Sequence, residues 1–479
     1  MKVSRKEFIS GAVLALVIIS LVASIFNSFT ASRNNLGILI GFIIIGIISL
    51  YGALSDPRVI SMNKVFWYFQ VVFMSLAPAC QYVTGYYPWR VLCSDTDMAI
   101  AQVMVIIFIL NYYLIYRSRY RGYILSMGRK KVSLSMSIQK YLTTERSYGI
   151  GIRYFLLAIG VIGFVLLIRL VGFYNLFIRS ENELSIENST INFVVRKFLT
   201  ALPAIICAIF IREKNKTILD WTAILILFAI TVCSNFPTST TRYWMGTIFV
   251  GLILVLVLKR VESRTVDYGI IIGLLVAFPM FYIFKRSTLI DVMNAGLSYG
   301  GVVDSFNTVD FDAFAIVARS VRFVRENGIT WGKQLINIVL FFIPRRIWTS
   351  KPLTTNVIIA QSQGQTFTNL SCALPAEGYV NFGWVGVLIY AFITAKTNSF
   401  FDHVFWNSSY DEKSNIINII YPFLCIIGLY LNRGPLQPSF IQTIALILPM
   451  VVIIFITNTK TEKASNKRGK GNGKREQSY

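Results

Sequence analysis

The chain has 479 residues, is 55% hydrophobic and carries a formal net charge of +23. Apolar runs close to the ~20 residues that a helix needs to cross a bilayer recur along its whole length, which excludes a soluble domain. A transmembrane β-barrel would instead show ~10-residue alternating segments. The cations follow the pattern of membrane loops rather than forming a basic patch, so no nucleic-acid partner is expected.

Apolar spans follow a short basic N-terminus. The first span is longer than the ~7–15-residue core of a signal peptide, so it is predicted to be an anchor. The twelve predicted spans lie near 8–26, 36–54, 64–84, 98–116, 152–171, 193–211, 218–235, 242–258, 268–284, 384–401, 416–432 and 438–457. The fold class is therefore an all-α polytopic membrane protein of about twelve transmembrane helices, with a large segment between spans nine and ten.

The distribution of cations sets the orientation, because short cytoplasmic loops collect Lys and Arg. With the N-terminus inside, the basic segment 117–150 and the basic tail 458–479 are cytoplasmic. Both are predicted to be disordered and to lie along anionic headgroups. Both termini are then cytoplasmic. The chain divides into spans one to nine (1–284), an outer segment (285–383), spans ten to twelve (384–457) and the tail.

The outer segment is predicted to form a helical cap on the membrane surface. Residues 310–327 have the pattern of a helix, and Gly328 is a suitable C-terminal stop. The apolar stretch 331–343 has only ~13 residues, too few to span, so it is expected to lie in the interface or re-enter. Pro344 is expected to end it.

Cations gather at the predicted outer face, where short loops usually avoid them. They are Arg242, Lys285, Arg286, Arg345, Arg346, Lys351 and Arg433. The planar fork of arginine matches phosphate oxygens, so the set indicates a phosphate or pyrophosphate site. The alternative for each is that its side chain reaches to lipid headgroups.

Glu377 is the candidate general base; the alternative is a carboxylate favoured by a helix N-terminus. The glycines of Glu377-Gly378 and Phe382-Gly383 allow backbone to approach a ligand or another helix closely. Asp304, Asp310 and Asp312 are rival carboxylates. The single histidine, His403, falls on the cytoplasmic side, so no catalytic role is expected for it.

Metal or cofactor chemistry is not indicated. The six cysteines show no CxxC spacing, and no metal-ligand cluster is evident on the outer face. Cys93 and Cys372 lie in outward-facing loops, where they either pair or remain thiols. No Walker loop, GxSxG or HExxH motif occurs.

Several motifs together resemble a known family. They are Ile343-Pro344-Arg345-Arg346-Ile347-Trp348 followed by Lys351-Pro352, then Glu377-Gly378-Tyr379, Asn381-Phe382-Gly383, and Thr241-Arg242 at a helix start. With twelve spans and a late outer loop, they resemble the bacterial oligosaccharide repeat-unit polymerases of the Wzy type. The likeness covers roughly 235–390 by motif and the rest by topology alone.

The resemblance implies a membrane glycosyltransferase of the GT-C kind in the bacterial inner membrane. It implies that undecaprenyl-pyrophosphate-linked oligosaccharides are joined into O-antigen or another surface polysaccharide, with undecaprenyl pyrophosphate released and a chain-length regulator as a further partner. Glu377, Arg345 and Arg346 would be catalytic, and Arg242, Arg286, Lys351 and Arg433 would hold the pyrophosphate. Alternatives are an O-antigen ligase, whose relatives carry an outer-loop histidine, and a lipid-linked oligosaccharide flippase or transporter.

Overall fold

The computed structural model describes residues 35–126, 134–144, 148–177, 189–213, 215–258, 261–273, 306–408 and 415–472. The regular elements within these ranges are helices. Seven helices are long and apolar enough to cross a membrane: α2 (Leu36–Leu54), α5 (Asp95–Ser126), α7 (Ile150–Val171), α8 (Ser189–Arg212), α18 (Leu374–Trp406), α19 (Ile416–Arg433) and α20 (Leu436–Asn472). The prediction of a helical membrane protein is thus supported at this coarser level.

The remaining predicted spans divide into three groups. Spans 218–235 and 242–258 correspond to the shorter apolar helices α9 (Ile218–Ser234) and α10 (Arg242–Val257). Span 64–84 is a helix interrupted by a π-helical stretch, with α3 (Met62–Phe69), η1 (Gln70–Leu76) and α4 (Ala77–Thr84) in succession. Span 8–26 lies outside the described residues, and of span 268–284 only the end of α11 (Ser263–Ile272) and Gly273 are described.

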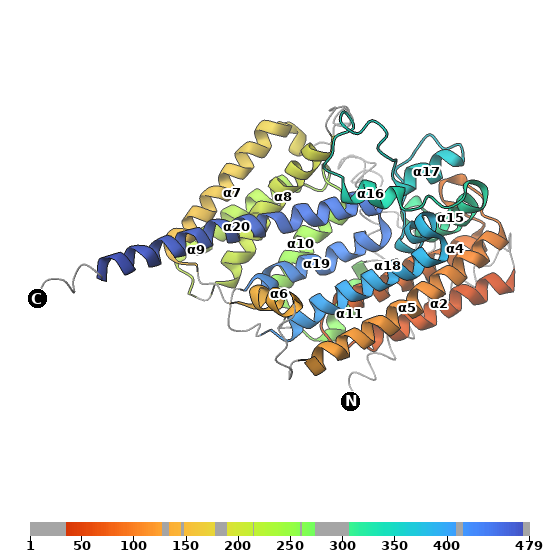
Figure 1. The fold of residues 1–479 in the computed structure, drawn as a ribbon, viewed down its shortest axis with the longest axis horizontal. Helices are drawn as coiled ribbons and strands as arrows, with labels where there is room; N and C mark the ends of the chain where they lie inside the picture. The colour runs from red at the N-terminus through yellow and green to blue at the C-terminus, as the bar shows by residue number, and fades with distance from the viewer. Residues whose placement is uncertain are drawn as a thin grey trace, which may run out of the picture.

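Two apolar cores hold the helices together. One gathers buried side chains of α2, α5, the 62–84 helix, the outer segment and the first part of α18. The other gathers side chains of α7, α8, α9, α10, α19 and α20 with the end of α18. Figure 1 shows the corresponding groups of helices side by side, with α18 and α19 between them. Large apolar side chains on the outward faces, such as Leu114 and Phe455, remain exposed, as expected for surfaces that meet lipid.

α18 is a broken helix, and the break lies close to its N-terminal end. Gly383 has φ +61°, and Phe382 beside it is also non-helical. The two parts pack so tightly that a Cβ on Gly386 would lie 1.9 Å from the carbonyl oxygen of Gly378. The close approach predicted for Gly378 is therefore confirmed, with the other half of the same helix as its partner, whereas a Cβ on Gly383 would meet no atom nearer than 3.7 Å. This break places Glu377 on a short half-helix at the end of the bundle.

The outer segment forms a helical cap over that end of the bundle (Figure 1). Its described elements are η6 (Val309–Phe311), α15 (Ala313–Asn327), α16 (Lys333–Val339) and α17 (Thr355–Ser362). The predicted helix that stops at Gly328 is confirmed, since Gly328 has φ +76° after α15. The cap also satisfies carbonyls freed by the break in α18. Thr330 N–H donates to Val380 O at 2.9 Å, and Gly332 N–H donates to Asn381 O at 3.2 Å.

Two segments are more helical than the sequence indicates. The inner segment 117–150, predicted to be disordered, contains the end of α5 and the separate helix α6 (Leu134–Thr143). α20 continues to Asn472, well into the basic tail for which disorder is predicted. Figure 1 shows its C-terminal part projecting beyond the bundle. Because Lys, Arg and Glu are good helix formers, a preceding helix can continue through polar sequence of this kind.

A buried polar network, not anticipated from the sequence, fixes the other end of the bundle. The Asp402 carboxylate accepts the N–H groups of Met62 and Asn63, at 2.9 and 3.2 Å, and thereby caps α3. It also accepts the hydroxyl of Tyr116 at 2.7 Å. Arg58 lies 3.4 Å from the same carboxylate. The network therefore joins α3, α5 and α18, which are far apart in the sequence.

The same network holds a second carboxylate in its ionised form. Asp56 follows the end of α2, and the guanidinium of Arg58 bonds to both of its oxygens. Burial raises the pKa of Asp56, but the charge and hydrogen bonds of Arg58, together with Lys64 and Asn63, outweigh this effect and lower the pKa to about 2. A buried pair with extra hydrogen bonds is costly to break from one side only, so these residues fit a structural role.

The orientation predicted from the cations can be tested by cysteine labelling. Gln361 lies exposed in the cap, and Ser137 lies exposed on α6. We expect a membrane-impermeant thiol reagent applied to intact cells to label a Gln361→Cys variant, while Ser137→Cys is labelled only after the membrane is opened. Five of the six native cysteines are buried, so background labelling is low. The reverse pattern would place the cap in the cytoplasm and contradict the predicted orientation.

Candidate functional site

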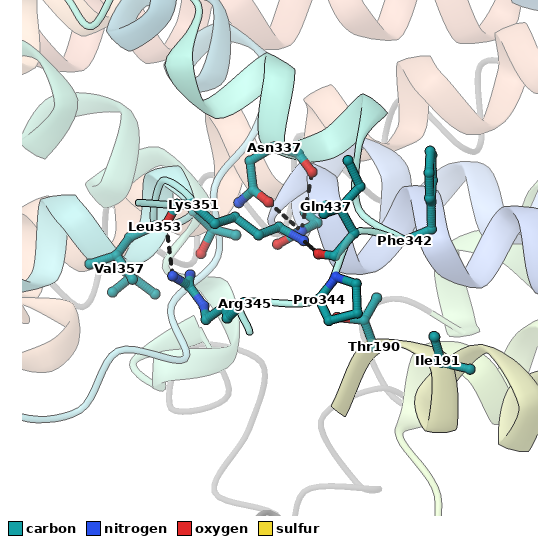
Figure 2. A pocket seen from close by; sticks show the side chains of 12 residues that line it. Thr190, Ile191, Asn337, Phe342, Pro344, Arg345, Lys351, Leu353, Val357 and Gln437 are labelled. Carbon is teal, nitrogen blue, oxygen red and sulfur yellow. Dashed lines mark hydrogen bonds between the residues drawn. The ribbon is translucent and has the colours of Figure 1, made fainter. Parts of the chain in front are cut away.

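A polar cavity of about 310 Å³ lies where the cap meets the starts of α8 and α20. Arg345 and Lys351 line it from one loop, and Asn337 and Gln437 line it from α16 and α20 (Figure 2). Thr190, at the start of α8, lines another side. Two of the predicted cations are thus brought to one cavity, which we call the Arg345 cavity.

Both cations are held in place by backbone oxygens. The guanidinium of Arg345 donates to Lys351 O at 2.7 Å and to Pro352 O at 3.3 Å. The ammonium group of Lys351 donates to Phe341 O at 2.9 Å and to Ile343 O at 2.8 Å. These bonds close the turn around Pro344, so the loop is fixed by the same side chains that give it charge.

The charge balance of the Arg345 cavity follows from its described lining. Among the described residues that line it, none is an aspartate or a glutamate. Burial lowers the pKa of Lys351, and repulsion from the neighbouring Arg345 lowers it further. Two like charges close together favour the binding of an anion, because an anion relieves their repulsion. The cavity is therefore suited to a negatively charged group.

Arg242 and Arg433 form a second group, beneath the cap, in which each arginine forms an ion pair with an aspartate. Arg242, the first residue of α10, pairs with Asp310. Arg433, the last residue of α19, donates to Asp312 Oδ1 at 2.9 Å and to Asp310 O at 2.8 Å. No hydrogen bond or ion pair between described residues joins this group directly to Arg345.

The two aspartates of this group differ in how fully they are bonded. Asp312 is buried, and besides Arg433 it accepts Trp89 Nε1–H at 2.7 Å and Ser371 N–H at 3.2 Å. Asp310 meets Arg242 through Oδ1, while its Oδ2 is buried and has no hydrogen-bond partner. An unpaired carboxylate oxygen is unfavourable, so Asp310 is the member of the pair with capacity for a further donor.

Glu377, the predicted base, lies behind the Arg345 cavity. It is buried, with only 1% of its surface exposed. Its Oε2 accepts the hydroxyl of Thr355 at 2.5 Å, and its Oε1 accepts the N–H of Leu436 at 3.0 Å. The neighbouring residues Thr354 and Gln437 line the Arg345 cavity. Glu377 thus lies one layer behind that cavity and ties α17 and α20 to the half-helix of α18.

Other predicted residues are less closely integrated or lie elsewhere. Arg346 is exposed next to Arg345 and does not line the Arg345 cavity. Lys285, Arg286 and Asp304 lie outside the described residues. His403 is buried near the opposite end of α18, beside Asp402, with its ring edge towards Tyr120. Cys93 and Cys372 are both buried and form no disulfide with each other.

Several residues at the site carry no signal in the sequence. Asn337 and Gln437 are ordinary amides in apolar helices, yet they bond to each other at 3.0 Å across the Arg345 cavity. Trp89 belongs to a short loop that reads as a simple connector, and only the fold brings it to Asp312. In the described part of the chain, no group of three His, Cys, Asp or Glu residues has the arrangement of a metal site.

Taken together, fold and site define a helical membrane protein with a cationic cap at one end of the bundle. Comparison with protein-family models, with curated proteins and with solved structures finds no match.

Proposed function

We propose that the protein is a membrane glycosyltransferase that polymerises undecaprenyl-pyrophosphate-linked oligosaccharide repeat units at the outer face of the bacterial inner membrane. A hydroxyl of one repeat unit attacks the anomeric carbon of the sugar at the pyrophosphate end of the growing chain. The bond from that carbon to the pyrophosphate oxygen breaks, and its electron pair leaves with undecaprenyl pyrophosphate. A carboxylate takes the proton of the attacking hydroxyl.

The observation that carries this proposal is the Arg345 cavity. It offers two cations, without a lining acid among the described residues, at the end of an apolar bundle. A leaving pyrophosphate needs fixed donors that stabilise charge as the bond breaks. The carbonyl bonds of Arg345 and Lys351 fix these donors in advance.

An apolar groove provides further support. It has a volume of about 420 Å³ and is lined in its described part by α10, α11 and α19, with Arg242 and Tyr243 at one end. Its walls are mainly aliphatic side chains and glycines, such as Val250, Ile253 and Gly269. An apolar groove that ends at a cation suits an amphiphile with an anionic head, which describes a polyprenyl pyrophosphate.

An O-antigen ligase is a second candidate that we weigh against this proposal. The resemblance associates that activity with a histidine in the outer loop, whereas His403 lies far along α18 from the cap, beside the Asp402 network. A flippase would need polar groups along a path through the bundle. The ion pairs that the structure describes lie near helix ends, for example at Asp56 and Asp402 or at Asp310 and Asp312, and this distribution favours the polymerase.

Deletion of the gene, followed by gel analysis of surface polysaccharide, tests the proposed activity. We expect glycans that carry a single repeat unit, because flipping and ligation continue while polymerisation stops. Expression of the intact chain from a plasmid should restore the ladder of longer glycans. Loss of all surface glycan would contradict a polymerase and indicate a flippase or a ligase instead.

A further inference from the structure

A second cavity opens between the cap and the loop that follows α4. Its volume is about 460 Å³, within the range of small-molecule pockets, ~300–1,000 Å³. Its described lining includes three half-buried aromatic residues and three polar ones, namely Tyr86, Tyr87, Trp89, Arg90, Asn307 and Thr308. We call it the Trp89 cavity. It shares no described lining residue with the Arg345 cavity.

The aromatic wall is held in an unfavourable backbone conformation. Trp89 and Arg90 are consecutive and have φ of +62° and +56°, a region that residues other than glycine rarely adopt. The indole N–H donates to Asp312 at 2.7 Å, and the ring stacks on Phe367 with centroids 4.7 Å apart. Such strain persists only where the surroundings enforce it, and it concentrates at functional sites.

The polar wall has hydrogen-bonding capacity to spare. Asn307 accepts the Thr84 hydroxyl through Oδ1 at 3.0 Å, which fixes the orientation of its amide. The Asn307 Nδ2 group has no hydrogen-bond partner in the described part of the chain. Arg90 is exposed, and its side chain forms no ion pair or hydrogen bond with described residues. Both groups are therefore available to a ligand.

We propose that the Trp89 cavity binds a saccharide, the sugar of the incoming repeat unit. Sugars present a C–H face that packs on aromatic rings, and a rim of hydroxyls that require donors and acceptors. The aromatic wall supplies the first kind of contact, and Asn307 and Arg90 supply the second. The assignment of the sugar as acceptor rests on the proposed function.

The position of the cavity fits an acceptor site. Thr308 and Val309 of its lining directly precede Asp310. Asp310 pairs with Arg242, which lies at the end of the apolar groove. Trp89 connects to the same group through Asp312. A sugar in the Trp89 cavity would therefore lie beside the aspartates and near the predicted position of the donor's head group.

Saturation-transfer NMR on the full-length protein in nanodiscs tests this assignment. The probe is the repeat-unit oligosaccharide released by mild acid from the host's own lipid-linked precursor. We expect transfer to the C–H protons of the sugar with the unaltered protein. Arg90→Ala and Tyr87→Ala should each weaken binding by about tenfold or more, because each removes a direct contact.

Two control variants match these substitutions. Arg322→Ala removes an exposed arginine of α15 that pairs with Glu326, and Trp331→Ala removes a tryptophan that also has positive φ but is 75% exposed and outside the cavity. Both should bind the oligosaccharide as the unaltered protein does. A thermal unfolding measurement on each variant shows whether a loss of binding is caused by a loss of the folded structure.

The outcomes separate this inference from the proposed function. Unaltered affinity in both Arg90→Ala and Tyr87→Ala overturns the assignment of the cavity. Polymer synthesis by a protein to which the oligosaccharide does not bind overturns it as well. In a third outcome, the oligosaccharide binds and the Arg90 and Tyr87 substitutions weaken its binding, but the protein makes no polymer from lipid-linked substrate. That result supports the assignment of the Trp89 cavity and contradicts the proposed polymerase function.

Discussion

Substitution of Arg345 or Arg242 by lysine is expected to abolish polymer while leaving the amount of protein in the membrane unchanged. The Arg345 guanidinium donates to two successive carbonyls, a fixed fork that a lysine ammonium cannot reproduce. A preorganised donor to developing charge contributes ~3–4 kcal/mol, or ~10²–10³ in rate. The measurement is the rate of polymer formation by purified protein from lipid-linked repeat units.

The lysine substitution separates the two interpretations of these cations. A side chain that only reaches to lipid headgroups tolerates lysine, because charge and apolar stem are kept. At position 242, a lysine would still carry a positive charge that can pair with Asp310, so the substitution keeps the ion pair and removes only the guanidinium geometry. Arg346→Lys, next in sequence but outside the Arg345 cavity, belongs in the same series, since the sequence assigns Arg346 the same role. If all three variants polymerise normally, the pyrophosphate site lies elsewhere.

Asp310→Asn is expected to lower kcat by ~10²–10⁴, the usual effect of losing a general base. Asp310 has a carboxylate oxygen without a hydrogen-bond partner, so it can accept a proton from a bound hydroxyl. The sequence favours Glu377 for this role, but both Glu377 oxygens accept hydrogen bonds from the protein. We therefore infer that Asp310 is the base and that Glu377 positions the surrounding helices.

Glu377→Gln is the matched comparison. A glutamine oxygen can still accept from Leu436 N–H, and the Thr355 hydroxyl can rotate to accept from the new amide. The variant is thus expected to fold and to retain most activity. A large loss in Glu377→Gln with normal turnover in Asp310→Asn would return the role to Glu377.

Much of the fold could be predicted from local pattern. Eleven of the twelve predicted spans coincide wholly or in part with described helical segments, because an apolar run of that length has few alternatives to a helix in a membrane. Gly328 ends α15 as predicted, since glycine adopts positive φ at little cost. The break at Phe382-Gly383 was visible only as a pair of residues that permit close approach. Its geometry depends on the cap segment that pairs with it.

The site was predictable in its chemistry and not in its connections. The cation pattern alone predicted that Arg345, Lys351, Arg242 and Arg433 belong to an anion site. In the structure, Arg345 and Lys351 share a cavity without an acid among its described lining residues. Arg242 and Arg433, in contrast, each pair with an aspartate. Both arrangements depend on contacts between segments that are distant in the sequence. Asp310 lies 68 residues from Arg242 in the sequence, and nothing in either local sequence specifies the other.

The sequence by itself determined the class of this protein, because hydrophobic length and charge distribution act locally, one span and one loop at a time. Only the tertiary structure decided which polar groups are satisfied within the protein and which remain available. Glu377 is buried and links α17 and α20 to the half-helix of α18. Asp310 has a carboxylate oxygen without a hydrogen-bond partner, and the loop at Trp89 forms one wall of a cavity. Hydrogen bonding and burial depend on neighbours in space, and the packing of helices alone sets those neighbours.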